Sequence, residues 1–197
     1  MIRNETLQTK NLNIDQLIES CKKADKSAQF ELYKRYYKTL YNTAFRILNN
    51  SCEAEDVMQE SFLSAYSKLG TFKAENTNAN SEATFGAWLK RIVINKSLTQ
   101  LKKINKHEKV PLERIENIKE EDDYSDYSSV KAGEVLKGIQ QLKGNYKLVL
   151  NLHFIEGYDY EEISEITKWS NQNIRVQIAR AKQKLKENLK LKYEQIT

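Results

Sequence analysis

Few residues in this chain of 197 are of the types that do catalytic or metal chemistry. Its two cysteines, Cys21 and Cys52, form no CxxC pair. Its two histidines, His107 and His153, lie far apart in the sequence. A zinc site takes four well-spaced ligands, so we predict no metal centre. The phosphate-binding patterns GxGxxG and GxxxxGK do not occur either. The residue types therefore favour a binding protein over an enzyme, and we expect no cofactor.

Basic side chains gather in two separate parts of the chain, whose formal net charge is +5. Residues 88–110 hold seven Lys or Arg and one Glu, and residues 170–192 hold the same numbers. Between them, residues 113–126 hold seven acids and two bases. Two basic regions suggest a polyanion that is met at two places, although solvated helix surfaces give the same composition.

Residues 157–189 predict two helices joined by a tight turn. Asp159 and Glu162 have the spacing of a capping box at the start of the first helix. Trp169 falls in the turn, and Ser170 is placed to cap the second helix. Apolar residues at steps of three and four should pack the second helix against earlier ones, and they are Ile174, Ile178, Ala181, Leu185 and Leu189.

The outward side of this second helix carries side chains that suit duplex DNA, since such a helix can lie in the major groove. Arg175 can bind guanine edges, and Asn171 or Gln172 can bind adenine. Val176 and Ala179 are small enough to permit close approach to bases. Four basic residues suit phosphates, which position the protein without reading sequence, and they are Arg180, Lys182, Lys184 and Lys186. A hairpin that only packs would show the same apolar spacing, and the basic charge favours DNA binding over it.

A predicted helix over residues 51–69 has two unlike sides. Ser51 is expected to cap it and Gly70 to end it in a left-handed conformation. At about 100° per residue, one side gathers Ala54, Val57, Met58, Phe62, Ala65 and Leu69. The opposite side gathers Asp56, Gln59, Glu60 and Leu63. The pattern leaves two interpretations of that opposite side open, a plain solvent face or a surface for a basic partner.

Residues 71–84 are polar and predict a long loop, after which a helix resumes at Phe85. Trp88 lies on the apolar stripe of this helix, close to Lys90 and Arg91. Single-stranded nucleic acid binds to such groups, because bases stack on rings and phosphates meet cations. A core tryptophan on an amphipathic helix explains the same pattern, so both interpretations stay open.

The remaining elements are also predicted to be helical, because one proline and six glycines give few turn signals. Asn13 and Gln16 mark the start of one helix, and a longer helix spans residues 25–49. Two supporting helices are expected over residues 130–142 and 145–157. Their expected core residues are Leu136, Ile139, Leu142, Leu148, Val149, Leu152 and Phe154.

These elements predict an all-α fold with two small helical domains joined by a flexible acidic linker, the second domain containing the helix-turn-helix. The expected bounds are 1–104 for the first domain, 105–129 for the linker and 130–197 for the second domain. The linker is acidic and poor in apolar residues, which favours an extended chain. No apolar run approaches the ~18 residues of a membrane span, and the first residues lack a signal-peptide core. We therefore expect a cytoplasmic protein without a membrane span.

With both halves in view, the chain resembles the RNA polymerase sigma factors of the extracytoplasmic-function group of the sigma-70 family, from about Phe30 to Leu189. The first half carries FELYKRYYKTLYNTAFRIL, AEDVMQESFLSAY and FGAWLKRIVINKSLTQLKK. The second half carries IQQL, GYDYEEISEI, and Ser170 followed by IRVQIARAKQKL. Several blocks in family order and at family spacing are far more specific than any one motif.

The resemblance implies a factor, not an enzyme, that binds core RNA polymerase and directs promoter-specific transcription initiation, reading and opening promoter DNA. Its expected polymerase-binding residues are Asp56, Gln59, Glu60 and Leu63. Its expected contacts with the minus-ten element and the single strand are Phe72, Lys73, Asn78, Asn80, Trp88, Lys90, Arg91 and Asn95. Its expected contacts with the minus-thirty-five element are Ser170, Asn171, Gln172, Asn173, Arg175, Val176, Ala179, Arg180 and Lys182. The implied partners are core polymerase and promoter DNA, and an anti-sigma factor is a further candidate partner. Nothing in the sequence predicts more than a monomer.

The chain departs from the family pattern at several positions. Lys143 follows Leu142 where the family usually has proline, and Lys168 stands where glycine is common. A left-handed lysine is uncommon, so we expect the turn to be wider or mildly strained. Asn173 and Gln177 replace the usual threonine and basic residue, and both changes bear on which DNA sequence is recognised. Two other classes stay open, a stand-alone helix-turn-helix regulator and a protein that binds only other proteins.

Overall fold

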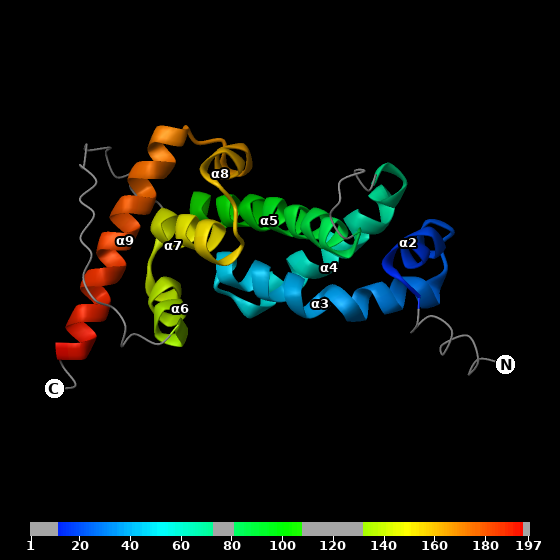
Figure 1. Ribbon diagram of the computed structural model, residues 1–197, viewed down its shortest axis with the longest axis horizontal. Helices are drawn as coiled ribbons and strands as arrows, with labels where there is room; N and C mark the ends of the chain where they lie inside the picture. Colours follow the sequence, from blue (N-terminus) through cyan, green and yellow to red (C-terminus); the bar gives the residue numbers. More distant parts are fainter. Residues whose placement is uncertain (1–11, 73–80, 108–131, 195–197) are drawn as a thin grey trace. The chain divides into compact units, whose positions relative to one another are not determined.

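The computed structural model describes residues 12–72, 81–107 and 132–194, and it divides the chain into two compact units, residues 1–106 and 107–197. Within the described ranges every regular element is a helix (Figure 1). This confirms the expected all-α fold with two domains. Most of the predicted linker, together with its acidic tract, lies outside the described residues.

The first unit contains α2 (Ile14–Lys22), α3 (Lys26–Leu48), α4 (Ser51–Lys68), the 3₁₀ turn η2 (Leu69–Thr71) and α5 (Ser81–His107). Helices α3 and α4 pack closely together, and α2 packs on α3. Their shared core is continuous with the apolar stripe of α5, where Phe85, Leu89 and Val93 are buried. Burial of one side of each helix leaves the opposite sides for other contacts.

The helix starts of the first unit follow side-chain capping. Asn13 and Gln16 form the predicted capping box, and Asp25 accepts hydrogen bonds from two amides at the start of α3. Asn50, not Ser51, caps α4, because its Oδ1 accepts the amides of Cys52 at 3.0 Å and Glu53 at 3.2 Å. The prediction for Ser51 was therefore wrong by one residue, since the extended backbone of Asn50 brings a carboxamide oxygen to those amides first.

Two predictions about the chain after α4 are also wrong. Gly70 does not adopt a left-handed conformation, because the chain continues into the 3₁₀ turn η2 and closes it with a hydrogen bond from the Phe72 amide to the Leu69 carbonyl. Helix α5 begins at Ser81, so the last four residues of the predicted loop are helical. Glu82 lies in its first turn, where a carboxylate is favoured by the helix dipole.

The second unit contains α6 (Ala132–Gln141), α7 (Gly144–Leu150), the π turn η3 (Asn151–Ile155), α8 (Tyr160–Thr167) and α9 (Asn171–Glu194). Helix α9 packs against α6, α7 and α8 (Figure 1). Gly138 faces α9, where a Cβ would meet the end of the Leu185 side chain at 2.6 Å, so any larger residue would make that side chain move. The fold thus presents one long helix whose inner side is covered by three shorter ones.

Five of the seven predicted core residues of this unit are buried, namely Ile139, Leu142, Leu148, Val149 and Leu152. The other two predictions are wrong, because Leu136 is 47% exposed and Phe154 is 52% exposed. Leu136 lies away from the side of α6 that is centred on Gly138 and Ile139. Phe154 lies in η3, a π turn, which has more residues per turn than an α-helix. Its side chains therefore point in other directions than regular α-helical spacing predicts.

Candidate functional site

The outward face of α4 is formed by four side chains at helical spacing. Asp56, Gln59 and Glu60 are exposed, and Leu63 has 70% of its surface exposed. The opposite side of α4 is buried, with Val57, Met58 and Phe62 in the core. The predicted division of the helix is confirmed: two acids and an amide surround an exposed leucine. Such a face offers an apolar anchor and negative charge to a basic partner.

Two side chains of α5 reach across to the acids of α4. Lys96 Nζ lies 3.2 Å from Glu60 Oε2, and Gln100 Nε2 donates a hydrogen bond of 2.6 Å to Glu53 Oε2. The first is a solvent-exposed pair, and exposed pairs contribute only about 0–1 kcal/mol. Glu60 therefore belongs to the outward face of α4 and is also attached, weakly, to the basic helix beside it.

An aromatic cluster stands at the start of α5. Phe72 lies 5.2 Å from Phe85 and 5.1 Å from Trp88, measured between ring centroids. Phe85 is fully buried, whereas Phe72 and Trp88 are half-buried. Tyr36 meets the Phe85 ring edge-on, and burial, with Glu82 nearby, raises the pKa of Tyr36 to about 12. The cluster therefore holds Phe72, at the end of η2, against the first turns of α5.

The structure gathers part of the predicted single-strand site on α5. Lys90 and Arg91 are half-buried two and three residues after Trp88, and Asn95 is exposed one turn further on. Three other predicted residues, Lys73, Asn78 and Asn80, lie outside the described residues. The described part of the predicted single-strand site is thus an aromatic cluster followed by two cations and an amide.

Helices α8 and α9 form the predicted helix-turn-helix. Asp159 and Glu162 make both hydrogen bonds of the capping box at the start of α8. Ser170 Oγ accepts the Asn173 amide at 3.3 Å at the start of α9. Lys168 ends α8 with φ 65° and ψ 23°, so the expected strained turn is present.

The two sides of α9 divide as predicted. Ile174, Ile178 and Ala181 are buried, and Leu185 and Leu189 are half-buried. The outer residues are exposed or half-buried and comprise Ser170, Asn171, Gln172, Asn173, Arg175, Val176, Ala179, Arg180 and Lys182. Gln177 is buried, and its amide donates to Asn173 Oδ1 at 3.4 Å, so part of the Asn173 side chain is used within the helix.

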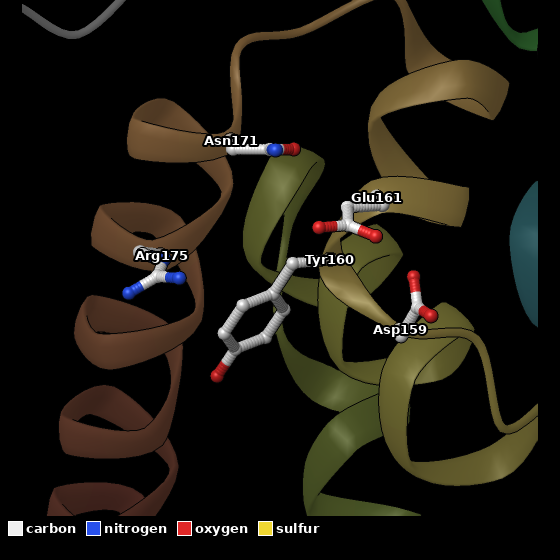
Figure 2. A pocket seen from close by; sticks show the side chains of 5 residues that line it. All are labelled: Asp159, Tyr160, Glu161, Asn171 and Arg175. Atoms are coloured by element: carbon white, nitrogen blue, oxygen red, sulfur yellow. The ribbon is translucent and has the colours of Figure 1, made fainter.

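A hollow of about 220 Å³ opens between the starts of α8 and α9 (Figure 2). Asp159, Tyr160 and Glu161 line it from α8, and Asn171 and Arg175 line it from α9. The Tyr160 ring stands between the two helices, with the Arg175 guanidinium carbon 5.5 Å from its centroid. Tyr160 and Glu161 are not among the predicted site residues, because nothing in the sequence pattern joins the first turn of α8 to the second turn of α9.

In the described part of the chain, no group of three or more His, Cys, Asp or Glu side chains could hold a metal ion. None of the helices in the described ranges combines the length and the apolar character of a membrane span.

The chain is similar to known proteins along most of its length. Residues 32–107 match the family Sigma-70 region 2, and residues 132–185 match Sigma-70, region 4. The RNA polymerase sigma-H factor of Pseudomonas aeruginosa is 28% identical over 179 residues, covering 85% of this chain and 89% of that protein. The ECF RNA polymerase sigma factor SigW of Bacillus subtilis is 25% identical over 192 residues, covering 90% and 97%.

Solved structures show the same fold. The sigma factor RpoE, in its complex with the anti-sigma factor NepR from Bartonella quintana, has a TM-score of 0.52 at 21% identity, covering 81% of this chain and 95% of that one. CnrH, solved with the cytosolic domain of CnrY, has a TM-score of 0.51 at 20% identity, covering 89% and 96%.

The two family matches fall on separate units and in family order. The region 2 match contains the acidic face of α4 and the basic helix α5, and the region 4 match contains the helix-turn-helix. With the full-length likeness to the curated sigma factors, these matches show that the chain belongs to the extracytoplasmic-function group of the sigma-70 family.

Proposed function

We propose that this chain binds core RNA polymerase and directs promoter-specific transcription initiation, with the first unit docking on polymerase and the second reading duplex DNA upstream. The observation that carries the proposal is the pair of family matches, region 2 on the first unit and region 4 on the second. The charge of the exposed faces supports it, because α4 offers acids around a leucine and α9 offers cations.

The docking role is assigned to Asp56, Gln59, Glu60 and Leu63. All four side chains are exposed, and none of them supports the core of the first unit. An exposed leucine among acids can desolvate against an apolar patch while the acids meet basic groups at its rim. Substitutions on this face should therefore change binding without changing the fold.

The duplex-reading role is assigned to the outer side of α9. The N-terminal turn of a helix can meet a phosphate with its N–H groups, and Arg175 is an outward residue suited to a bidentate contact with guanine. Arg180 and Lys182 follow on the same helix and suit phosphates. The contacts with particular bases stay predictions, because the outer residues define which kinds of contact can form and do not identify the promoter sequence.

The strand-opening role is assigned to the start of α5 and the segment before it. Phe72 and Trp88 supply half-buried rings, while Lys90, Arg91 and Asn95 supply cations and an amide. A base taken out of the stack costs a few kcal/mol, roughly the worth of stacking on one or two rings. Lys73, Asn78 and Asn80 remain predicted members of this site.

We propose no chemical step for the chain itself, because polymerase forms the phosphodiester bonds of the transcript. A cytoplasmic location, where polymerase and chromosome meet, follows from that role and is part of the proposal. An anti-sigma factor stays a prediction as a further partner. A stand-alone regulator would differ by binding its DNA site tightly without polymerase.

Promoter-dependent transcription with purified core polymerase tests the proposal. We expect the chain to convert core polymerase to specific initiation on fragments of its own genome. Failure to bind core polymerase, together with no specific initiation from any fragment, would refute it. Tight sequence-specific duplex binding without polymerase would instead support the stand-alone regulator.

A charge reversal tests the docking face separately. Asp56→Arg combined with Glu60→Arg should abolish binding to core polymerase, because two acids become two cations facing a basic surface. Asp15→Arg combined with Glu19→Arg is the matched control, since these exposed acids of α2 have the same spacing. Both variants should keep their circular dichroism spectra. Unchanged polymerase affinity in the α4 variant, or an equal loss in the α2 variant, would contradict the docking assignment.

A further inference from the structure

Three rings form a row on the second unit beside the outer side of α9. The Tyr160 centroid lies 5.1 Å from that of His153, and the His153 centroid lies 4.7 Å from that of Phe154. Tyr160 begins α8, while His153 and Phe154 both lie in the π turn η3. We call these three residues the aromatic row. Its members come from two elements that precede α9 in the chain.

Each end of the aromatic row is covered by a cation of α9. The Arg175 guanidinium carbon lies 5.5 Å from the Tyr160 centroid, and Lys182 Nζ lies 5.6 Å from the Phe154 centroid. Both distances are within the ~6 Å range of cation–π attraction. Arg175 and Lys182 are seven residues apart on α9, which is about two turns and roughly 10 Å along one face. Both cations are thus held by rings on the same side of the helix.

The middle ring of the row is held in place by a backbone contact. His153 Nδ1 lies 2.8 Å from the Tyr158 carbonyl oxygen. A carbonyl can only accept, so Nδ1 carries the hydrogen and donates it. Tyr158 in turn donates its amide to the Leu152 carbonyl at 3.0 Å, which closes the loop between η3 and α8. The orientation of His153 therefore follows from the backbone of this loop, and the two outer rings pack against it.

The exposure of Phe154 is consistent with a contact of this kind. A phenylalanine that is 52% exposed contributes little to a core, and the π turn that carries it is a distortion often found at functional sites. Arg175 and Lys182 themselves are exposed, and within the described residues neither forms an ion pair with a carboxylate. The ring faces are therefore the contacts that restrict these long side chains before DNA arrives.

We propose that the aromatic row is a positioning platform that orients Arg175 and Lys182 for duplex DNA, with Tyr160 setting the base-reading arginine and Phe154 setting the phosphate-binding lysine. The inference rests on the proposed DNA-binding role of α9. A side chain that is already oriented loses less conformational freedom when it binds, so the row strengthens each contact without touching DNA itself. Tyr160 and Phe154 are positioning residues in this scheme.

The two ends of the row predict different losses. Tyr160→Leu removes the ring beneath a base-reading residue, so discrimination between right and wrong sequence should fall roughly two- to five-fold, the value of an exposed cation–π contact. Phe154→Leu removes the ring beneath a phosphate-binding residue, so affinity should fall by a similar factor on every duplex while discrimination is kept. Tyr160→Phe and Phe154→Tyr keep the rings and should behave as wild type.

The test uses holoenzyme assembled from the full chain and core polymerase. An upstream element is first selected by the wild-type holoenzyme from promoters randomised in that region. Each variant holoenzyme is then measured on the selected promoter and on one with a scrambled upstream element. Failure of the wild type to select any element would count against the proposed function, and with it against the platform.

A double-mutant cycle separates positioning from a structural role. In an Arg175→Ala background, Tyr160→Leu should cause no further loss, because the side chain that it orients is gone. An equal loss with and without Arg175, or a loss with Tyr160→Phe as large as with Tyr160→Leu, would show that the tyrosine only supports the fold and would overturn the inference. So would a loss with Arg175→Ala and none with Tyr160→Leu. Weaker polymerase binding by Phe154→Leu would assign that ring to a protein contact instead and would equally overturn it.

Discussion

The turn of the helix-turn-helix stores backbone strain at Lys168, and replacing this residue by glycine should release it. Lys168 is held at φ 65° and ψ 23° as the residue that ends α8. Three hydrogen bonds fix this conformation: the Lys168 amide to the Ser164 carbonyl at 2.8 Å, the Trp169 amide to Thr167 Oγ1 at 3.2 Å, and Ser164 Oγ to the Trp169 carbonyl at 2.6 Å. The chain therefore adopts a left-handed residue despite its Cβ.

The size of the effect follows from two opposing contributions. A left-handed conformation costs a residue with a Cβ roughly 1–2 kcal/mol. Glycine avoids that cost, but its freer unfolded chain lowers stability by about 0.4–1 kcal/mol. Lys168→Gly should therefore stabilise the second unit by about 1 kcal/mol, which raises the unfolding midpoint of a domain of this size by ~4–8 °C.

Fluorescence can follow the second unit alone. The chain has two tryptophans, Trp88 in the first unit and Trp169 in the turn itself, so a Trp88→Phe background leaves Trp169 as the reporter. Lys168→Ala is the matched control, since it removes the charge but keeps the Cβ and should give no gain. Asn49→Gly, followed by Trp88 in the first unit with Trp169 replaced by phenylalanine, offers a second comparison. Asn49 has φ 56°, but asparagine tolerates that conformation better, so its gain should be smaller. An equal gain from Lys168→Ala, or a lower midpoint for Lys168→Gly, would refute the strain argument.

Three further predictions concern a buried thiol and a helix cap. Near pH 8, one thiol of the native chain should react with a disulfide reagent, and two should react in denaturant. The reason is that Cys52 is exposed, whereas burial raises the pKa of Cys21 to about 11. Two fast-reacting thiols in the native chain would contradict this. Since that pKa lies above the ordinary value of 9.0, the stability due to the Cys21 thiol should be complete below about pH 9 and be lost as pH rises toward 11, which urea unfolding at several pH values would measure. Asp159→Ala should lower the free energy of unfolding of the second unit by ~0.5–2 kcal/mol, while Asp159→Asn, which still caps, should change it far less.

Helical periodicity predicted the faces of α4 and α9 well because both are regular helices with one buried side. At a constant turn per residue, the exposed position of Leu63 follows from the buried positions of Val57 and Phe62. The same reasoning failed at Phe154, because η3 is a π turn and the assumed angle per residue no longer holds. It failed at Leu136 because the centre of the buried side of α6 is a glycine, Gly138, which hydrophobicity does not mark.

The residue that caps α4 could not be predicted from the sequence for a different reason. Asn50 and Ser51 are both good capping residues, and the sequence cannot decide between neighbours that differ by one position. The choice follows from α3, whose last residue is succeeded by Asn49 in a left-handed conformation, and this directs Asn50 into an extended one. The aromatic row was beyond sequence analysis for a related reason: three rings and two cations from three elements meet only through the packing of α8 and η3 on α9.

The Lys96–Glu60 pair connects the two sites proposed for the first unit. Glu60 belongs to the face assigned to polymerase, and Lys96 belongs to the helix assigned to single-stranded DNA. When a basic surface of polymerase takes the carboxylate of Glu60, the ammonium of Lys96 becomes available for a phosphate. By reciprocity, a phosphate that takes Lys96 frees Glu60 for polymerase. Because an exposed pair is worth at most about 1 kcal/mol, the coupling from this contact is limited to roughly five-fold. We therefore expect polymerase docking and strand binding to strengthen each other by a small amount, whichever partner binds first.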